Sequence, residues 1–209
     1  MLVKREFFPR IRSCGKIIFI ISLSVFALLY GVYFICSRYD IQFDKFTCDP
    51  PIVFHYHPFA GSLSYAGILL WCATVAVCLF SAVIAGKKGQ KKEQWFLLFF
   101  GLLTLAMLVD DLFMFHDFVF PEYFHVPQEW VYLVYLIIIM IYSFVFYRII
   151  FRTDYILLMT AFVFFALSLF YDIKMPQRGI ANLFEDGFKL CGIVHWFVYF
   201  VRSSFGFIV

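Results

Sequence analysis

The chain has 209 residues, of which 64% are hydrophobic and 15% are charged, and its formal net charge is +3. Soluble domains are about half apolar and about a quarter charged, and a soluble fold of this length leaves a large fraction of its surface in water. The composition therefore excludes an ordinary soluble domain and indicates a protein that has the lipid bilayer as its solvent.

Six apolar segments are long enough to cross a bilayer as helices, which takes about 20 residues. They are residues 17–36, 63–85, 95–118, 130–151, 155–171 and 188–207. The first could be a secretory signal, but its apolar run is too long and no small-residue cleavage site follows it, so we expect a retained helix. Since no repeat or linker divides the chain, the sequence predicts a single transmembrane domain over residues 1–209, an all-α bundle of six helices.

Lysine and arginine residues are unevenly distributed between the two sides of this predicted bundle. With both termini in the cytoplasm, twelve lie on the inner side and four on the outer side, as the preference of cytoplasmic loops for positive charge requires. The inner residues are Lys4, Arg5, Arg10, Arg12, Lys16, Lys87, Lys88, Lys91, Lys92, Arg148, Arg152 and Arg202, and the outer ones are Arg38, Lys45, Lys174 and Arg178. The sequence therefore predicts cytoplasmic N and C termini, in a bacterial cytoplasmic membrane or its equivalent. No basic patch interleaved with aromatic residues favours nucleic-acid binding.

The longest predicted outer segment, residues 37–61, combines prolines with apolar side chains. Pro50, Pro51 and Pro58 prevent a continuous helix, yet the neighbouring Ile, Val and Phe residues are too apolar for a solvated loop. We expect this segment to lie at the membrane interface or to cap the bundle. Cys36 and Cys48 could form a disulfide there if that side is oxidising, and two unpaired thiols fit the sequence equally well.

The stretch LVDDLFMFHDF, residues 108–118, places four ionisable side chains in the third predicted span. Charged residues within spans are costly, usually pair with one another and mark function. At about 1.5 Å per residue, Asp110 and Asp111 lie in the outer half of the helix, with His116 and Asp117 near its outer boundary. Asp110 and Asp117 are predicted to share one helix face.

The sixth predicted helix runs in the opposite direction and brings further ionisable residues into the same layer. Glu185 and Asp186 begin at the outer boundary, and Lys189 lies about one turn deeper. We therefore expect Lys189 to pair with Asp110 or Asp111. Carboxylates outnumber cations in this layer, to which Asp172 and Glu129 also belong, and such a surplus either binds a cation or holds protons.

Two interpretations of this layer need no metal or cofactor. One is purely structural: a single ion pair with Lys189, and acids at helix ends that water and the dipole of the sixth helix stabilise. The other is an outward-facing site that binds protons or a cation, in transport, sensing or support of a membrane complex. The sequence shows neither the paired halves nor the broken helices that transporters use.

A third interpretation is a membrane-embedded, metal-dependent hydrolase that acts on a lipid or a small substrate of the outer leaflet. His116, Asp117, Glu185, His55 and His57 could supply ligands for a divalent metal, although no HExxH or HxxxH pair is present.

A fourth interpretation is a structural or cofactor-bearing subunit of a larger membrane complex. His195 lies near the middle of its span and could ligate a haem or a chlorophyll, although a lone histidine in a helix is more often a packed core residue. The expected partners are the bilayer lipids and, for this interpretation, other membrane subunits.

Overall fold

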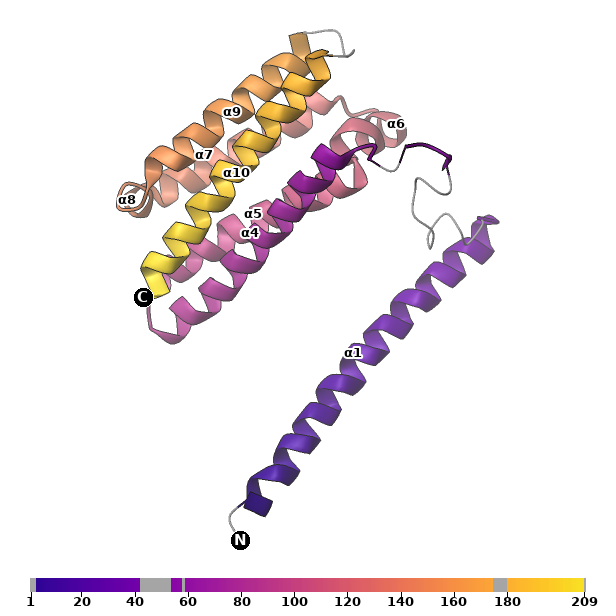
Figure 1. Ribbon diagram of the computed structural model, residues 1–209, viewed down its shortest axis with the longest axis vertical. Coiled ribbons are helices and arrows are strands. Elements are labelled where there is room, and N and C mark those ends of the chain that lie inside the picture. Colours follow the sequence, from indigo (N-terminus) through magenta and orange to yellow (C-terminus); the bar gives the residue numbers. More distant parts are fainter. Residues whose placement is uncertain (1–2, 42–53, 58, 175–179, 209) are drawn as a thin grey trace. The chain divides into compact units, whose positions relative to one another are not determined.

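The computed structural model describes residues 3–41, 54–57, 59–174 and 180–208, and these are helical apart from short turns, with no strand among them. The chain divides into two units, Met1–Ala60 and Gly61–Val209, and the main element of the first is helix α1 (Val3–Tyr39). The elements of the second unit, drawn in Figure 1, are α4 (Ser62–Lys87), α5 (Lys91–Phe113), the π-helix η1 (Phe115–Val119), α6 (Phe120–Phe124), α7 (Gln128–Val145), α8 (Tyr147–Ile150), α9 (Tyr155–Lys174) and α10 (Ile180–Ile208).

Six of these helices, α1, α4, α5, α7, α9 and α10, are long and apolar enough to cross a membrane. This confirms the predicted class, an all-helical transmembrane protein with six candidate spans. The proline-rich segment falls largely on residues 42–53 and 58, which lie outside the described residues. The predictions of a capping loop and of a disulfide to Cys48 therefore stay predictions.

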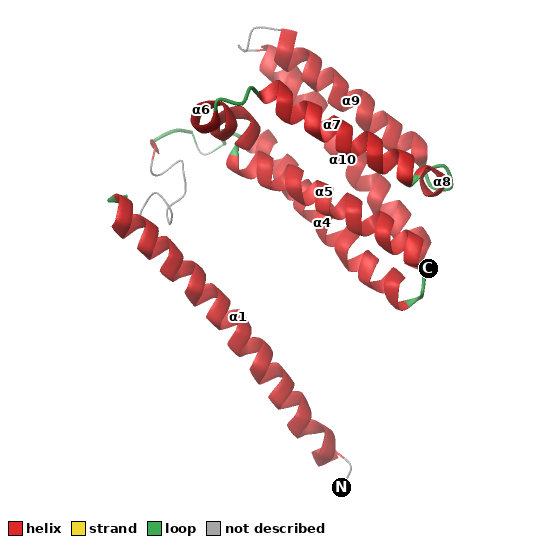
Figure 2. Cartoon of the chain, turned by 180° about the vertical axis from the view of Figure 1, so that it is seen from behind, coloured by secondary structure: helices red, strands yellow, loops and turns green. Residues whose placement is uncertain are grey.

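Successive long helices of the second unit run antiparallel to one another (Figure 2), with a short turn between α4 and α5 and with η1 and α6 between α5 and α7. The turn between α4 and α5 contains Gly89, whose φ of 78° is a left-handed conformation that glycine adopts without steric cost. Helix α10 packs against both α9 and α4, and α4 packs against α5. Helix α10 therefore lies between α9 and α4, and α4 lies between α10 and α5.

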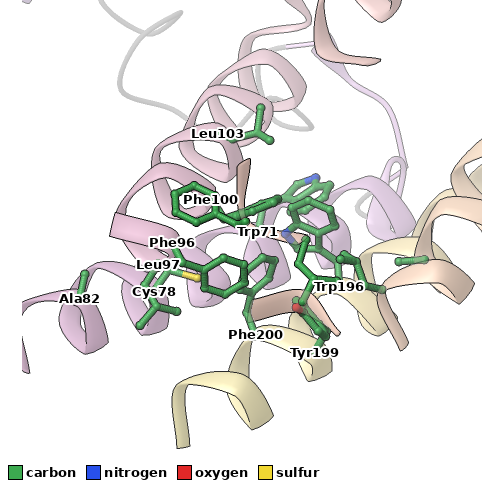
Figure 3. Packing of buried hydrophobic residues seen from close by; sticks show 14 of the residues in the cluster. Trp71, Cys78, Ala82, Phe96, Leu97, Phe100, Leu103, Trp196, Tyr199 and Phe200 are labelled. Atoms are coloured by element: carbon green, nitrogen blue, oxygen red, sulfur yellow. The ribbon is translucent and has the colours of Figure 1, made fainter. Parts of the chain in front are cut away.

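The core of the second unit is built from aromatic rings on α4, α5 and α10. Figure 3 shows Trp196 and Phe200 of α10 lying against Phe100 of α5, and the Trp196 and Phe200 ring centroids are 5.1 Å apart. Trp196 donates its indole N–H to the Thr104 hydroxyl over 3.1 Å, and that hydroxyl donates to the Phe100 carbonyl over 2.7 Å. Buried polar groups need such partners in a membrane, where no water replaces them.

The third predicted span, residues 95–118, is not the continuous helix that the sequence suggested. Helix α5 ends at Phe113, Met114 adopts a left-handed conformation with φ 52°, and residues 115–119 form a π-helix. Pro121 lies in the first turn of α6, where its missing N–H is tolerated, whereas an α-helix that ran on from α5 would lose the hydrogen bond from residue 121 to the Asp117 carbonyl. The fourth span is also shorter than predicted, since α7 ends at Val145 instead of near residue 151.

Candidate functional site

The break after α5 brings His116 back onto the side chain of Asp110. One carboxylate oxygen of Asp110 accepts the backbone N–H of His116 over 2.9 Å, and the other lies 2.9 Å from Nδ1 of the His116 ring. Both residues are only 5% exposed. Asp110 therefore has two tasks, since it supplies an acceptor for a backbone group at the break and holds the imidazole.

The other nitrogen of the same ring also faces a carboxylate. Nε2 of His116 lies 3.2 Å from Asp117 Oδ1, and the Asp117 side chain is 54% exposed. Both ring nitrogens are donors only in the protonated imidazolium. Burial lowers the pKa of His116, but the hydrogen bond with Asp110 and the charges of Asp117 and Asp110 raise it by more, so the pKa of His116 lies above its usual value. The geometry thus favours the positively charged form of His116, with a proton on both ring nitrogens.

Lys189 of α10 lies against Asp111, one of the two aspartates expected for this pair. Its ammonium nitrogen is 2.9 Å from Asp111 Oδ1, while Asp111 Oδ2 accepts the indole N–H of Trp71 over 2.9 Å. Trp71 belongs to α4, is almost fully buried and was not identified from the sequence. The available signal was a tryptophan inside a span, whose N–H needs an acceptor there.

A second polar group connects α7 with α9 beside the histidine. The Tyr132 hydroxyl donates to Asp172 Oδ2 over 3.1 Å, and the Tyr132 ring lies 5.2 Å from the His116 ring. Tyr135, also on α7, donates its hydroxyl to the Ala106 carbonyl of α5 over 3.5 Å. Helix α7 therefore places the Tyr132 ring beside His116 and is also hydrogen-bonded to α5.

Glu185 and Asp186 are half-buried and lie within electrostatic range of Lys189. Helix α10 begins at Ile180, so neither acid is in its first turn. The interpretation that the helix dipole stabilises these two acids is therefore wrong, because this effect fades within the first turn.

The candidate metal ligands do not assemble in the part of the chain that the structure describes. Among those residues no group of three or more His, Cys, Asp or Glu side chains could hold a metal ion. His55 and His57 belong to the first unit, and His116, Asp117 and Glu185 to the second. The hydrolase interpretation thus gains no support from the described residues.

His195, the candidate cofactor ligand, has a local partner. Its Nδ1 lies 2.8 Å from the Cys191 carbonyl oxygen, one helical turn earlier, and its ring packs 5.2 Å from Phe164. Since the carbonyl can only accept, Nδ1 is the donor, and Nε2 is the nitrogen that could ligate a metal centre.

Comparison with known proteins identifies a family. A family model described as "Domain of unknown function (DUF8692)" matches residues 21–203, so the chain belongs to this family. No curated protein and no solved structure matches the chain.

Proposed function

We propose that this DUF8692 protein is a membrane protein whose His116 binds and releases a proton, and that this protonation serves transport or the sensing of pH. The observation that carries the proposal is the contact of both His116 ring nitrogens with carboxylates, 2.9 Å to Asp110 and 3.2 Å to Asp117, at an interruption of a membrane helix. Histidine is the side chain whose charge changes most readily near neutral pH.

A proton fits this site better than a metal cation. The buried carboxylates already face cationic groups of the protein, since Asp110 contacts His116 and Asp111 contacts Lys189. The positive charge that can be lost without breaking the contacts between helices is therefore the second proton of the His116 ring. Asp117 is half exposed and contacts Nε2, so it offers that proton a route to water.

Loss of the proton would act on the backbone as well as on the ring. Asp110 holds the His116 backbone N–H and the His116 ring with one carboxylate, so a neutral ring weakens one of two contacts that shape the break. A local change of charge at a two-state element is the usual basis of a pH switch. The other groups that face the ring are Lys189, whose charge opposes protonation, and Tyr132.

We further propose that this site faces the outside of a cytoplasmic membrane, with both termini inside. Most of the described basic residues of the second unit gather where α4 ends, α5 begins and α10 ends, together with the α7–α9 connection, whereas Lys174 and Lys189 lie elsewhere. The residues that gather at this end are Lys87, Lys88, Lys91, Lys92, Arg148, Arg152 and Arg202. Placement of this basic end in the cytoplasm follows the positive-inside preference and leaves the break with His116 on the outer side.

The test is a titration of the histidine rings by NMR, on protein in detergent micelles with isotope-labelled histidine. Five histidine signals are expected, and His116→Gln identifies one of them by removing it. We expect the His116 ring to keep both nitrogens protonated above the pH at which an ordinary histidine titrates, and Asp110→Asn to lower its pKa.

His125→Asn is the matched control, because His125 is exposed and has a left-handed backbone that asparagine tolerates. It should remove a different signal and leave the titration of His116 unchanged. A His116 ring that is singly protonated at pH 6 in the wild-type protein would contradict the proposal.

A further inference from the structure

A polar groove lies at the other end of the second unit, between the start of α9 and the end of α10. Two adjoining hollows of about 510 and about 640 Å³ share Thr153, Asp154 and Arg202 among their lining residues. Figure 1 shows α8 and the C-terminus at this same end. We call these two hollows together the α9–α10 groove, and it is separate from the His116 site.

Two polar residues of the groove, Thr153 and Asp154, are held by contacts between α10 and the turn that precedes α9. Tyr199 and Thr153 lie 2.9 Å apart through their hydroxyl groups, and the Thr153 hydroxyl donates to the Ile150 carbonyl over 2.8 Å. Arg202 donates its Nε–H to Asp154 over 2.5 Å. A guanidinium has several further N–H donors, so this one contact does not exhaust the capacity of Arg202 to bind an anion.

The charge of the groove is positive. Arg152 and Arg202 both line it and are both exposed, whereas Asp154 is the acid among its lining residues. The neighbouring turn between α4 and α5 adds Lys88, whose ammonium group contacts the carbonyl of Ile208 at the end of α10. An anion in the groove would therefore meet complementary charge from several directions.

The rest of the groove is apolar and open to the surroundings of the bundle. Ile156 and Phe205 line it and are each 66% exposed, and Leu157, Val198 and Val201 are also among its lining residues. A small soluble anion would use the arginines but leave these apolar residues uncovered. A molecule with an anionic head and an apolar tail would cover both parts.

We propose that the α9–α10 groove binds an anionic phospholipid, with the headgroup phosphate on Arg152 and Arg202 and an acyl chain along Ile156 and Phe205. Basic pockets between transmembrane helices on the cytoplasmic side are known to bind anionic headgroups. The groove would thus anchor the end of α10 to the lipid surface, and this binding would not depend on the protonation of His116.

Native mass spectrometry of the detergent-solubilised protein tests this, with phosphatidylglycerol and phosphatidylcholine of identical acyl chains as probes. The wild-type protein should retain phosphatidylglycerol preferentially, and Arg152→Gln should lower that retention about fivefold, the usual effect of one charge at a lipid surface. Arg148→Gln is the matched control: Arg148 lies 5.6 Å above the Tyr147 ring and is not among the lining residues, so its loss should change retention little.

Asp154→Asn provides an independent variant, because it removes the acid from the groove. We expect it to raise retention of phosphatidylglycerol above that of the wild-type protein. If Arg152→Gln fails to fold, this increase is the result that tests the proposal, and its absence would contradict it. Equal retention of both lipids, or equal losses in Arg152→Gln and Arg148→Gln, would overturn the proposal. So would displacement of the lipid by millimolar inorganic phosphate, which would indicate a site for a soluble phosphate instead.

Discussion

Substitution of Asp110 by asparagine should destabilise the protein at pH 6 and do so much less at pH 9. Asparagine keeps an oxygen that can accept the His116 backbone N–H, but its NH₂ group cannot accept a hydrogen bond from a protonated ring. Once His116 is neutral, the same NH₂ group can donate to the ring nitrogen. The cost of the substitution therefore depends on the charge of His116 and not on the shape of the side chain at position 110.

The magnitude follows from the contacts that are lost. The His116 and Asp110 side chains are 6% and 7% exposed, so their charge-assisted hydrogen bond is little screened by water and should contribute about 1.5–3 kcal/mol. For the neutral ring we expect a cost below about 1 kcal/mol. Asp117→Asn removes a contact with a half-exposed carboxylate, which limits its effect to about 1 kcal/mol or less.

The direction of the pH dependence follows from the raised pKa of His116 in the folded protein. A raised pKa contributes stability that is fully present below the pKa of an unfolded histidine, about 6.5. That contribution is lost as the pH rises through the folded pKa. The free-energy difference between wild type and Asp110→Asn should therefore be largest below about pH 6.5 and shrink above it.

Equilibrium unfolding in mixed micelles with increasing SDS measures these differences, with tryptophan fluorescence as the signal because Trp71 and Trp196 lie in the core. His116→Gln combined with Asp110→Asn serves as the reference and should show no such pH dependence. If Asp110→Asn costs the same at pH 6 and pH 9, Asp110 acts only as an acceptor for the backbone at the break. The proton-binding proposal would then lose its basis.

Two further predictions use the same unfolding assay. Lys189→Met leaves the Asp111 carboxylate without its cation and should lower the free energy of unfolding by about 2 kcal/mol, less than for a fully buried pair because the Lys189 side chain is 37% exposed. Adding Asp111→Asn to this variant should restore much of the lost stability. If it does not, the two residues are not coupled. Gly192→Ala should cost about 1–3 kcal/mol, because a Cβ there would lie 2.6 Å from the Phe165 ring. Gly187→Ala, with nothing within 4 Å, should cost nothing, and equal effects of the two would contradict the packing of α9 on α10.

The fold was largely predictable because length and apolarity decide whether a helix can cross a membrane. The sequence also predicted that Lys189 pairs with Asp110 or Asp111, though not which of the two, since the rise per residue is the same in every helix and fixes the depth of each side chain. The break at Met114 did not follow, because helical periodicity assumes an uninterrupted helix. The predicted helix, residues 95–118, already ended before Pro121, so the proline gave no signal for a break as early as Met114.

The Asp110–His116 contact could not be derived from periodicity for the same reason. A left-handed residue between the two reverses the direction in which the chain presents the ring, so angular positions computed for an α-helix fail there. The contact of Trp71 with Asp111 depended on which helix packs beside α5. That is a property of the assembled bundle, which one sequence does not contain.

Helix α7 differs from its neighbours in that none of its residues is fully buried. It is held by aromatic side chains such as Tyr142, whose ring centroid lies 5.3 Å from that of Phe99, and by the Tyr132 hydroxyl on Asp172. Displacement of such a helix costs far less than separation of α4, α5 and α10, because little apolar contact is lost. The unit is therefore packed unevenly: α9, α10, α4 and α5 pack closely, each against the next, and α7, whose Tyr132 ring lies beside His116, is its least tightly packed long helix.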